Sequence, residues 1–473
     1  MKEKNSQNNE QVSFDNSPEG FSGVLPKATT ERLKTEKVFL ENNPQNSSIP
    51  KKESLLEEGE EYLKKIGPGV ITGAADDDPA GIATYSQAGA QYGTGLLWMA
   101  AWIYPLVATV QEMCARIALV TGRGLASNIK RTYPRKILYV CTILLFFANV
   151  LNIGADLGAM AKAVQLISPK ISFVILVVVT GLAGLFLEVL VPYRKYAKYL
   201  RWLVFAVFSY IFAGIIINMD WSLLLHDGFI PQITFSKTQI LLITGILGTT
   251  ISPYLFFWQT SEEIEEEISE GKKTIFSRKG TNKAELTKMR VDIWAGMFLS
   301  NLVMFFIIAV CANTLFVNGI TNIETASDAA RALAPLAGSG ASLLFAIGII
   351  GTGLLAVPIL AGSTAYAISE SFGWKEGLYR KFKTAHAFYG VIIVSIIIGI
   401  LLNFIGIDPI KALIYSAIAN GIVAPVILVF IVKISSSKKI MGEFKNSKLK
   451  KTIGWIATVL MGVTAIAAII SLF

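Results

Sequence analysis

Long apolar runs separated by short polar segments are the feature that most constrains this chain. A helix needs about 20 mainly apolar residues to cross the hydrocarbon core of a bilayer. Eleven stretches of the 473-residue sequence have this character, at 66–91, 95–120, 136–165, 171–191, 202–218, 238–260, 292–317, 340–370, 385–404, 409–433 and 452–472. The sequence therefore predicts an all-α, multi-pass protein of a cell membrane with eleven transmembrane helices.

The segment before these runs has a different composition. Charged residues make up only 16% of the whole chain, against about 25% in a typical soluble protein. Residues 1–60 are instead rich in Asn, Ser, Glu and Lys and contain no apolar stretch of signal-peptide length. We expect 1–60 to be a disordered cytoplasmic tail and 61–473 to be the transmembrane domain.

Basic residues are concentrated in alternate loops. The loops after the second, fourth, eighth and tenth runs are rich in Lys and Arg, at 121–136, 192–201, 373–384 and 433–451. The loops between them are poor in these residues, at 92–95, 168–171 and 405–408. Because cytoplasmic loops carry an excess of Lys and Arg, we expect a cytoplasmic N-terminus and an extracellular C-terminus. This pattern explains the net charge of +9 without a nucleic-acid-binding face.

Two of the apolar runs are interrupted by polar residues and a proline. The first is broken at residues 76–79 (DDDP) and the sixth at 249–253 (TTISP), five runs later. Interrupted helices at matching positions of two halves are typical of inverted-repeat transporters. The breaks predict a LeuT-type 5+5 inverted repeat, with halves at about 66–218 and 238–433 and an extra helix at 452–472.

Three consecutive aspartates, Asp76, Asp77 and Asp78, lie in the middle of the first run. A charge at the bilayer centre costs ~3 kcal/mol or more unless it is neutralised. The flanking residues are apolar or small, which argues against a helix end at the membrane surface. Pro79 has no amide hydrogen and leaves nearby carbonyls free. A carboxylate beside free carbonyls is an oxygen site for a hard divalent cation.

The second break offers the hydroxyls of Thr249, Thr250 and Ser252, followed by Pro253. Two roles are open for them. They either face the same ion as the aspartates or bond back to carbonyls of their own helix, as hydroxyls in membrane helices often do. Their position at the break that pairs with the first favours a role at the ion.

Other polar features have simpler interpretations. We interpret the acidic run at 262–267 (EEIEEE) as the solvated face of a helical continuation of the sixth span, and not as a metal site. Cys114, Cys141 and Cys311 lie in apolar runs and are expected to be buried thiols. The sequence contains no GxxxxGK[ST] motif and no recognisable catalytic triad or zinc-protease motif. Neither an enzyme nor an ATP-driven pump is predicted, and no cofactor is expected.

Three stretches of the chain carry a resemblance to known proteins: GPGVITGAADDDPAGIATYSQAGAQYGTGLLW at 67–98, QEMCARIALVTGRGLASNIK at 111–130 and GTTISPYLFFWQTS at 248–261. The first is similar to the first span of the NRAMP family of divalent metal transporters, and the third to their sixth span. The second is similar to the end of their second span and the following loop. The resemblance extends over about 60–470. It implies a secondary transporter that imports divalent metal ions by alternating access, with the ion between the two broken helices.

The resemblance also assigns roles to residues. The family's Asp-Pro-Gly-Asn motif corresponds to DPAG at 78–81, so the metal-binding aspartate is kept and the asparagine is replaced by glycine. The family's Met-Pro-His corresponds to SPY at 252–254. Carbonyls three residues before the aspartate and the methionine also bind the ion in the family. The metal ligands implied here are Asp78, Asp77, Ala75, Gly81, Thr249 and Ser252.

A second group of residues is expected around the site or along the pathway. In the third span the family pairs an aspartate with a glutamate three residues later in its proton path, whereas Asp156 is followed here by Ala159. Tyr254 stands in place of the sixth-span histidine, and a tenth-span glutamine aligns with Ala417. The expected outer or pathway residues are Asp76, Tyr254, Asp156 and Asn420.

These replacements favour a hard ion and weak coupling to protons. A thioether favours transition metals, so its replacement by Ser252 points to Mg²⁺ or Mn²⁺, as in the magnesium-transporting branch of NRAMP-related proteins. The loss of two titratable residues predicts that proton coupling is weak or absent. Two alternatives stay open: a proton-coupled Mn²⁺/Fe²⁺ symporter, and a LeuT-type transporter of a cationic organic solute.

Overall fold

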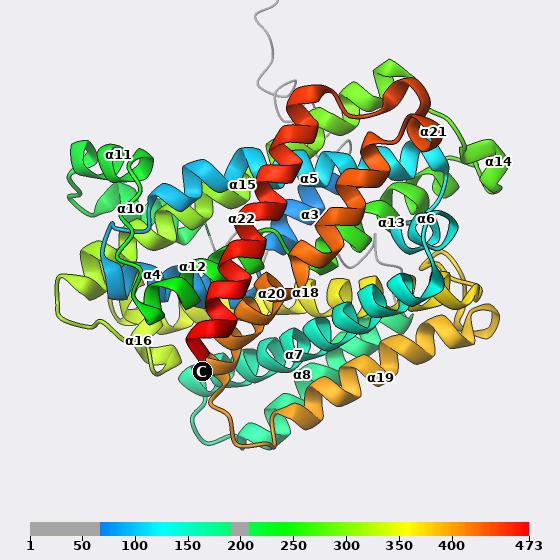
Figure 1. The fold of residues 1–473 in the computed structure, drawn as a ribbon. Coiled ribbons are helices and arrows are strands. Elements are labelled where there is room, and N and C mark those ends of the chain that lie inside the picture. Colours follow the sequence, from blue (N-terminus) through cyan, green and yellow to red (C-terminus); the bar gives the residue numbers. More distant parts are fainter. Residues whose placement is uncertain (1–66, 191–207, 473) are drawn as a thin grey trace, which may run out of the picture. The chain divides into compact units, whose positions relative to one another are not determined.

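A computed structural model describes residues 67–190 and 208–472, and every regular element within these ranges is a helix (Figure 1). The predicted tail at 1–60 and the basic loop at 192–201 lie outside the described residues. So does the beginning of the predicted span at 202–218. These three predictions therefore stay predictions.

Eight helical segments of the described chain are long and apolar enough to cross a membrane. They contain α5 (Trp98–Thr121), α7 (Arg135–Ile167), α8 (Phe173–Leu190), α12 (Lys237–Thr250) with α13 (Pro253–Ser269), α15 (Lys283–Cys311), α18 (Ala341–Phe372), α20 (Pro409–Ser436) and α22 (Lys448–Leu472). The predicted first span is split into α3 (Pro68–Asp76) and α4 (Pro79–Tyr92). The ninth is the shorter apolar helix α19 (His386–Leu402), and α10 (Ser209–Ile216) falls in the fifth. The count of eleven spans stays a prediction.

Short helices connect the long ones. They are α6 (Leu125–Thr132), α11 (Trp221–Phe229), α14 (Ile275–Arg278), α16 (Ala326–Ala330), α17 (Ala334–Ala337) and α21 (Lys438–Met441). Polar residues set where several of the helices begin. Reciprocal side-chain and backbone bonds from Thr274, Asn282 and Thr325 open α14, α15 and α16. Such capping satisfies amides that the first turn of a helix leaves without partners.

Glycines bring the two broken helices into close contact with their neighbours. A β-carbon added to Gly73 of α3 would lie 2.4 Å from the carbonyl oxygen of Gly296 in α15. One added to Gly248 of α12 would lie 2.1 Å from the carbonyl oxygen of Ala417 and 2.2 Å from the amide nitrogen of Gly421, both in α20. Small residues at these contacts let the backbones approach, as is common in membrane helix packing.

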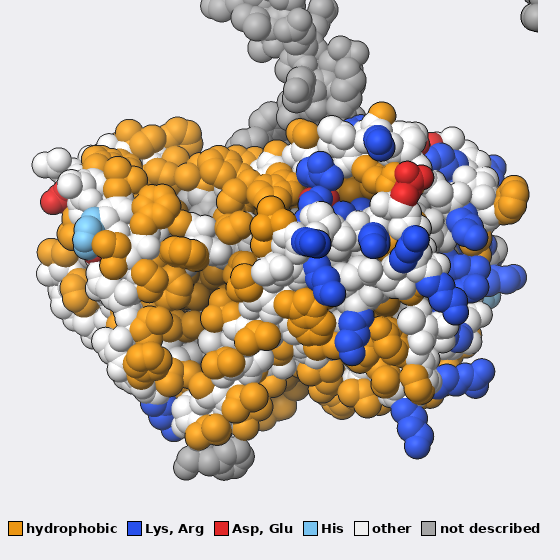
Figure 2. All heavy atoms as spheres, turned by 45° about the horizontal axis from the view of Figure 1, so that its top comes forward, with side chains coloured by type: hydrophobic (Ala, Val, Ile, Leu, Met, Phe, Trp, Pro, Cys, Tyr) orange, Lys and Arg blue, Asp and Glu red, His pale blue; other side chains and the backbone are white. Residues whose placement is uncertain are grey.

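The surface is consistent with a membrane location. Figure 2 shows hydrophobic side chains over much of the visible face, with most Lys and Arg gathered toward one side. In Figure 1 the short helices α6, α14 and α21 lie toward that same side, and α10, α11 and α16 lie toward the other. The three cysteines, Cys114, Cys141 and Cys311, are buried free thiols, as predicted.

The acidic run at 262–267 differs in part from its prediction. It is helical, within α13, as expected. However, Glu262, Glu263 and Glu267 are buried rather than solvated. Their helix packs against α5 and α18, and the Glu263 carboxylate accepts a hydrogen bond from Gln259 at 2.9 Å. The sequence EEIEEE contains a single apolar residue, so it did not indicate that this part of the helix would be buried.

Candidate metal site

The two predicted breaks are present, and they have nearly the same backbone. Asp77 and Asp78 separate α3 from α4, and Ile251 and Ser252 separate α12 from α13. The first residue of each pair has φ and ψ of −87° and 49° or −105° and 60°. The second is extended, with ψ of 169° or 139°. Each break is thus a two-residue step between helices.

A proline follows each step and leaves a carbonyl without its helical donor. In a continuous helix, the amide of residue 79 would bond to the carbonyl of Ala75, and that of residue 253 to the carbonyl of Thr249. Pro79 and Pro253 have no amide hydrogen to give. These are the two carbonyls expected to bind the ion. That of Ala75 accepts a hydrogen bond from the Tyr254 hydroxyl at 3.0 Å.

Asp78 is the point where the surrounding helices meet. Its buried carboxylate accepts the backbone amide of Gly81 at 2.7 Å and the hydroxyl of Thr249 at 3.3 Å on Oδ1. Oδ2 accepts the side-chain amide of Asn152 at 2.9 Å and lies 3.5 Å from the Tyr254 hydroxyl. Groups from α4, α7, α12 and α13 therefore converge on one carboxylate.

The two other aspartates face a different neighbour. The hydroxyl of Ser300 on α15 donates to Asp76 Oδ2 at 2.7 Å and is 3.2 Å from Asp77 Oδ1. No hydrogen bond joins either residue to Asp78 within the described chain. Nor do three or more His, Cys, Asp or Glu side chains of that part converge as a ligand set. The arrangement offers one carboxylate with neutral oxygens, and the expected role of Asp77 stays a prediction.

Ser252 takes the second of its two possible roles in this structure. Its hydroxyl donates to the carbonyls of Gly248 at 2.7 Å and Thr249 at 2.6 Å, one turn back in the same chain segment. Thr250 likewise bonds back, to the carbonyl of Ile246 at 2.8 Å. Of the three hydroxyls at this break, Thr249 alone is hydrogen-bonded to Asp78.

Asn152 was not among the predicted site residues, although it touches Asp78. It is fully buried on α7, four residues before Asp156, and its amide nitrogen lies 3.4 Å from Asp156 Oδ2. Residues four apart share one face of a helix. An asparagine four residues before an aspartate inside an apolar span was therefore a usable signal. The structure places the predicted pathway residue Asp156 directly behind this new contact.

Asn420 is close to the second break but is not joined to Asp78. It is buried on α20, next to Gly421, which packs against α12 at Gly248. Its Oδ1 has no hydrogen-bond partner within the residues that the structure describes. Its proposed place in the outer shell stays a prediction.

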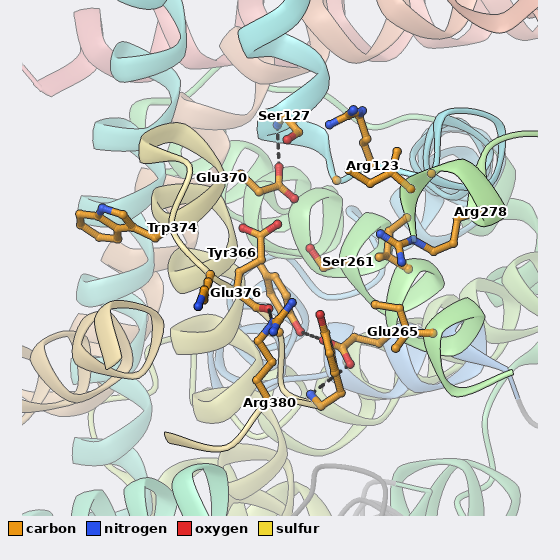
Figure 3. A pocket seen from close by; sticks show the side chains of 18 of the residues that line it. Arg123, Ser127, Ser261, Glu265, Arg278, Tyr366, Glu370, Trp374, Glu376 and Arg380 are labelled. Carbon is orange, nitrogen blue, oxygen red and sulfur yellow. Dashed lines mark hydrogen bonds between the residues drawn. The ribbon is translucent and has the colours of Figure 1, made fainter. Parts of the chain in front are cut away.

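A separate polar pocket of about 450 Å³ lies at the far end of α13, lined also by the segments 122–127 and 366–380 (Figure 3). Glu265 accepts the Tyr366 hydroxyl at 2.6 Å, and Glu370 accepts the amide of Ser127 at 2.6 Å. Burial, and then the carboxylates of Glu370 and Glu265, raise the pKa of Glu376 to about 9. None of the predicted metal-site residues lines this pocket.

A protein-family model and a curated relative match most of the chain. The family model described as natural resistance-associated macrophage protein-like, Nramp, matches residues 69–471. A divalent metal cation transporter MntH of Caldanaerobacter subterraneus subsp. tengcongensis is 26% identical over 401 residues, which is 83% of this chain and 89% of the relative.

Solved structures share the fold. A manganese transporter of Eremococcus coleocola, in complex with an aromatic bis-isothiourea substituted compound, superposes with a TM-score of 0.69 at 19% identity and covers 90% of both chains. A mutant of that transporter gives a TM-score of 0.65, with 89% of this chain and 88% of that chain covered.

Proposed function

The chain belongs to the natural resistance-associated macrophage protein-like (Nramp) family, whose members are transporters and not enzymes, and from this premise we propose that it imports divalent metal ions by alternating access. The observation that carries the proposal is the Asp78 carboxylate. It is buried inside the helical domain, at a break between two helices, and no Lys, Arg or His of the described residues is hydrogen-bonded to it. A membrane-embedded acid of this kind is a functional feature by default, and a cation would neutralise it.

We place the ion beside Asp78, between the C-terminal ends of α3 and α12. The carbonyls of Ala75 and Thr249 lie at these ends, where the negative end of each helix dipole favours a cation. Each carbonyl oxygen has two lone pairs, so the bond from Tyr254 or Ser252 leaves one for an ion or for its water. We keep Asp77 as a helper of Asp78.

Gly81 contributes by leaving space. A β-carbon added there would lie 3.2 Å from the Thr249 hydroxyl and 3.4 Å from Asp78 Oδ1. A longer side chain would fill this room, so that the ion would keep fewer of its waters. Mg²⁺ loses water reluctantly and usually keeps several water ligands in proteins. A glycine at this position supports a partly hydrated ion.

We propose that Mg²⁺, Mn²⁺ or both are the transported ions. The described residues that are hydrogen-bonded to Asp78 do so through oxygen or nitrogen atoms, and none of them does so through sulfur. Oxygen sites suit Mg²⁺ and Mn²⁺, whereas a thioether favours softer metals. The names of the manganese and divalent-metal transporters that the chain resembles support Mn²⁺ as one substrate.

We further propose that protons are not required for uptake. A divalent ion gains ~4.6 kcal/mol per 100 mV of inside-negative potential, twice the value for a single charge. Ala159 and Tyr254 occupy two positions at which the family has titratable side chains. A pH dye enclosed in proteoliposomes should report no acidification during Mg²⁺ or Mn²⁺ uptake. Acidification that follows uptake and disappears in Asp156→Asn would show instead a proton symporter.

The test of the function is uptake by the purified full chain in proteoliposomes. Mg²⁺ and Mn²⁺ should enter in a saturable manner, faster when a potassium diffusion potential makes the lumen negative. A cationic organic amine, offered under the same conditions, separates the rival with an organic substrate. Uptake of the amine without uptake of either metal would contradict the proposal.

A further inference from the structure

Asn152 carries an unpaired oxygen beside the proposed site. The residue is fully buried, and its amide nitrogen donates to Asp78 Oδ2 at 2.9 Å. Its own Oδ1 has no hydrogen-bond partner among the described residues. A buried polar atom left without a partner is costly and rare in folded proteins, so it calls for an explanation.

The position of Asn152 relative to Asp78 suggests what the oxygen is for. Gly81, where the family has asparagine, approaches Asp78 at Oδ1 through its backbone amide. Asn152 approaches the same carboxylate at Oδ2. The chain thus lacks a side-chain amide on one side of the carboxylate and has one, from another helix, on the opposite side.

An asparagine side chain can exchange its two ends by rotation with little change of shape. The amide nitrogen faces the Asp78 carboxylate and donates to it. With a divalent cation at Asp78, the donor would face positive charge and the oxygen would be favoured. Amide oxygens are common ligands of hard divalent cations, directly or through water.

We propose that Asn152 supplies to the bound divalent ion the amide oxygen that the first span lacks at Gly81. This inference rests on the proposed function, since it needs a metal ion at Asp78. It also gives the ion a second role. Asn152 belongs to α7, whereas Asp78 lies between α3 and α4, which both pack mainly against α15. An ion held by both Asp78 and Asn152 would link α7 to the break between α3 and α4.

The test is Mg²⁺ titration by calorimetry on the folded full chain, with monodispersity and thermal unfolding checked first. Asn152→Ala should weaken Mg²⁺ binding by at least about tenfold. Asn152→Asp keeps an oxygen but removes the donor, and should bind within about threefold of wild type or more tightly. A residue that only positions Asp78 through its donor would behave in the opposite way, because an aspartate there would repel Asp78.

The chain supplies a matched control and a rescue. Asn149 is buried on the same helix with an unpaired oxygen, but its amide donates to Leu360, Ser363 and Thr364 instead of Asp78. Asn149→Ala should leave the Mg²⁺ affinity unchanged. In the Asn152→Ala background, Gly81→Asn returns an amide to the first span and should recover at least part of the lost affinity.

The outcomes separate the inference from the function. If wild type binds neither Mg²⁺ nor Mn²⁺, the proposed function fails. If wild type binds and Asn152→Ala binds equally well, the function stands and this inference is wrong. If Asn152→Ala does not fold, Asn152→Asp decides: affinity near that of wild type supports an oxygen ligand, and loss of affinity in a folded protein overturns it.

Discussion

The two helix breaks share a backbone but not a chemistry. Each consists of two residues with matching dihedral angles followed by a proline, and each leaves one carbonyl without its helical donor. At the first break the residue before the proline, Asp78, gathers bonds from three other helices or half-helices. At the second, the hydroxyl of Ser252 bonds, among the described residues, only to the carbonyls of Gly248 and Thr249 in the preceding turn.

This difference shows which part of each break fixes shape and which part supplies a ligand. A proline and a two-residue step are enough to end one helix and start the next, whatever side chain stands between them. Only the first break has a charged side chain before its proline, so the two breaks are alike in backbone but differ in the ligand they could offer. The shared backbone supports the 5+5 inverted repeat, which we keep as a proposal.

The largest expected effect on metal uptake comes from removing the charge of Asp78 at the first break. Asp78→Asn keeps the oxygen that caps α4 but removes the charge, and should abolish Mg²⁺ and Mn²⁺ uptake in proteoliposomes. The affinity of Asp78→Asn for Mg²⁺ should fall more than about 100-fold, which corresponds to a loss of ~2.7 kcal/mol or more in binding free energy.

Asp408→Asn is the matched control for this loss. Asp408 also precedes a proline, Pro409, and caps α20 by accepting the amide of Ile410 at 2.9 Å. Asp408 lies just before α20, and no hydrogen bond joins its side chain to a site residue within the described chain, so uptake by Asp408→Asn should equal that of wild type. Normal uptake by a well-folded Asp78→Asn protein would remove Asp78 from the site.

Much of this comparison could be predicted from the sequence, because prolines and mid-span aspartates have strong local effects. The helices end within one residue of the predicted breaks for this reason. The partner of a side-chain hydroxyl, in contrast, is not determined by the neighbouring sequence. Ser252 has both a backbone carbonyl and an ion within its possible reach, and only the folded geometry decides between them.

Long-range partners were also hidden from the sequence. Asp77 was expected among the ligands and Asp76 in the outer shell, and both contact Ser300, which is more than 220 residues away in the chain. No local pattern connects residues so far apart. Asn152 is different, since its spacing from Asp156 was visible and only its contact with Asp78 required the fold.

The second expected effect concerns stability, and should be similar at both breaks. Gly73→Ala and Gly248→Ala each place a β-carbon within 2.4 Å of the backbone of another helix. Overpacking of this kind costs roughly 1–3 kcal/mol, so the thermal unfolding midpoint in detergent should fall by several degrees. Gly462→Ala in α22 is the control, because nothing lies within 4 Å of its added carbon. An unchanged midpoint for both variants would refute the close contacts.

A smaller effect is expected when the second break is given a soft ligand. Ser252→Met should raise the preference for Cd²⁺ over Mg²⁺ by about tenfold, since a thioether is a soft donor. Ser252→Leu has a similar volume and no sulfur, so it separates the chemistry from the change of size. Competition assays in which the Met and Leu variants show the same Cd²⁺/Mg²⁺ ratio would argue that this position does not reach the ion.

The smallest effect is expected from removing the Ser252 hydroxyl alone. Ser252→Ala loses the contacts of the hydroxyl with two carbonyls of the preceding helix α12, at 2.7 and 2.6 Å, and gives the Thr249 carbonyl back a free lone pair. These effects oppose each other, because a back-bond contributes only about 1 kcal/mol and the freed carbonyl is a better ligand. The Mg²⁺ dissociation constant should therefore stay within about threefold of wild type by calorimetry. Thr260→Ala, which removes a similar back-bond to Phe256 away from the break, gives the baseline for such a loss. A tenfold weakening in Ser252→Ala but not in Thr260→Ala would mean that the hydroxyl turns to the ion when it binds, and that the two breaks share their chemistry after all.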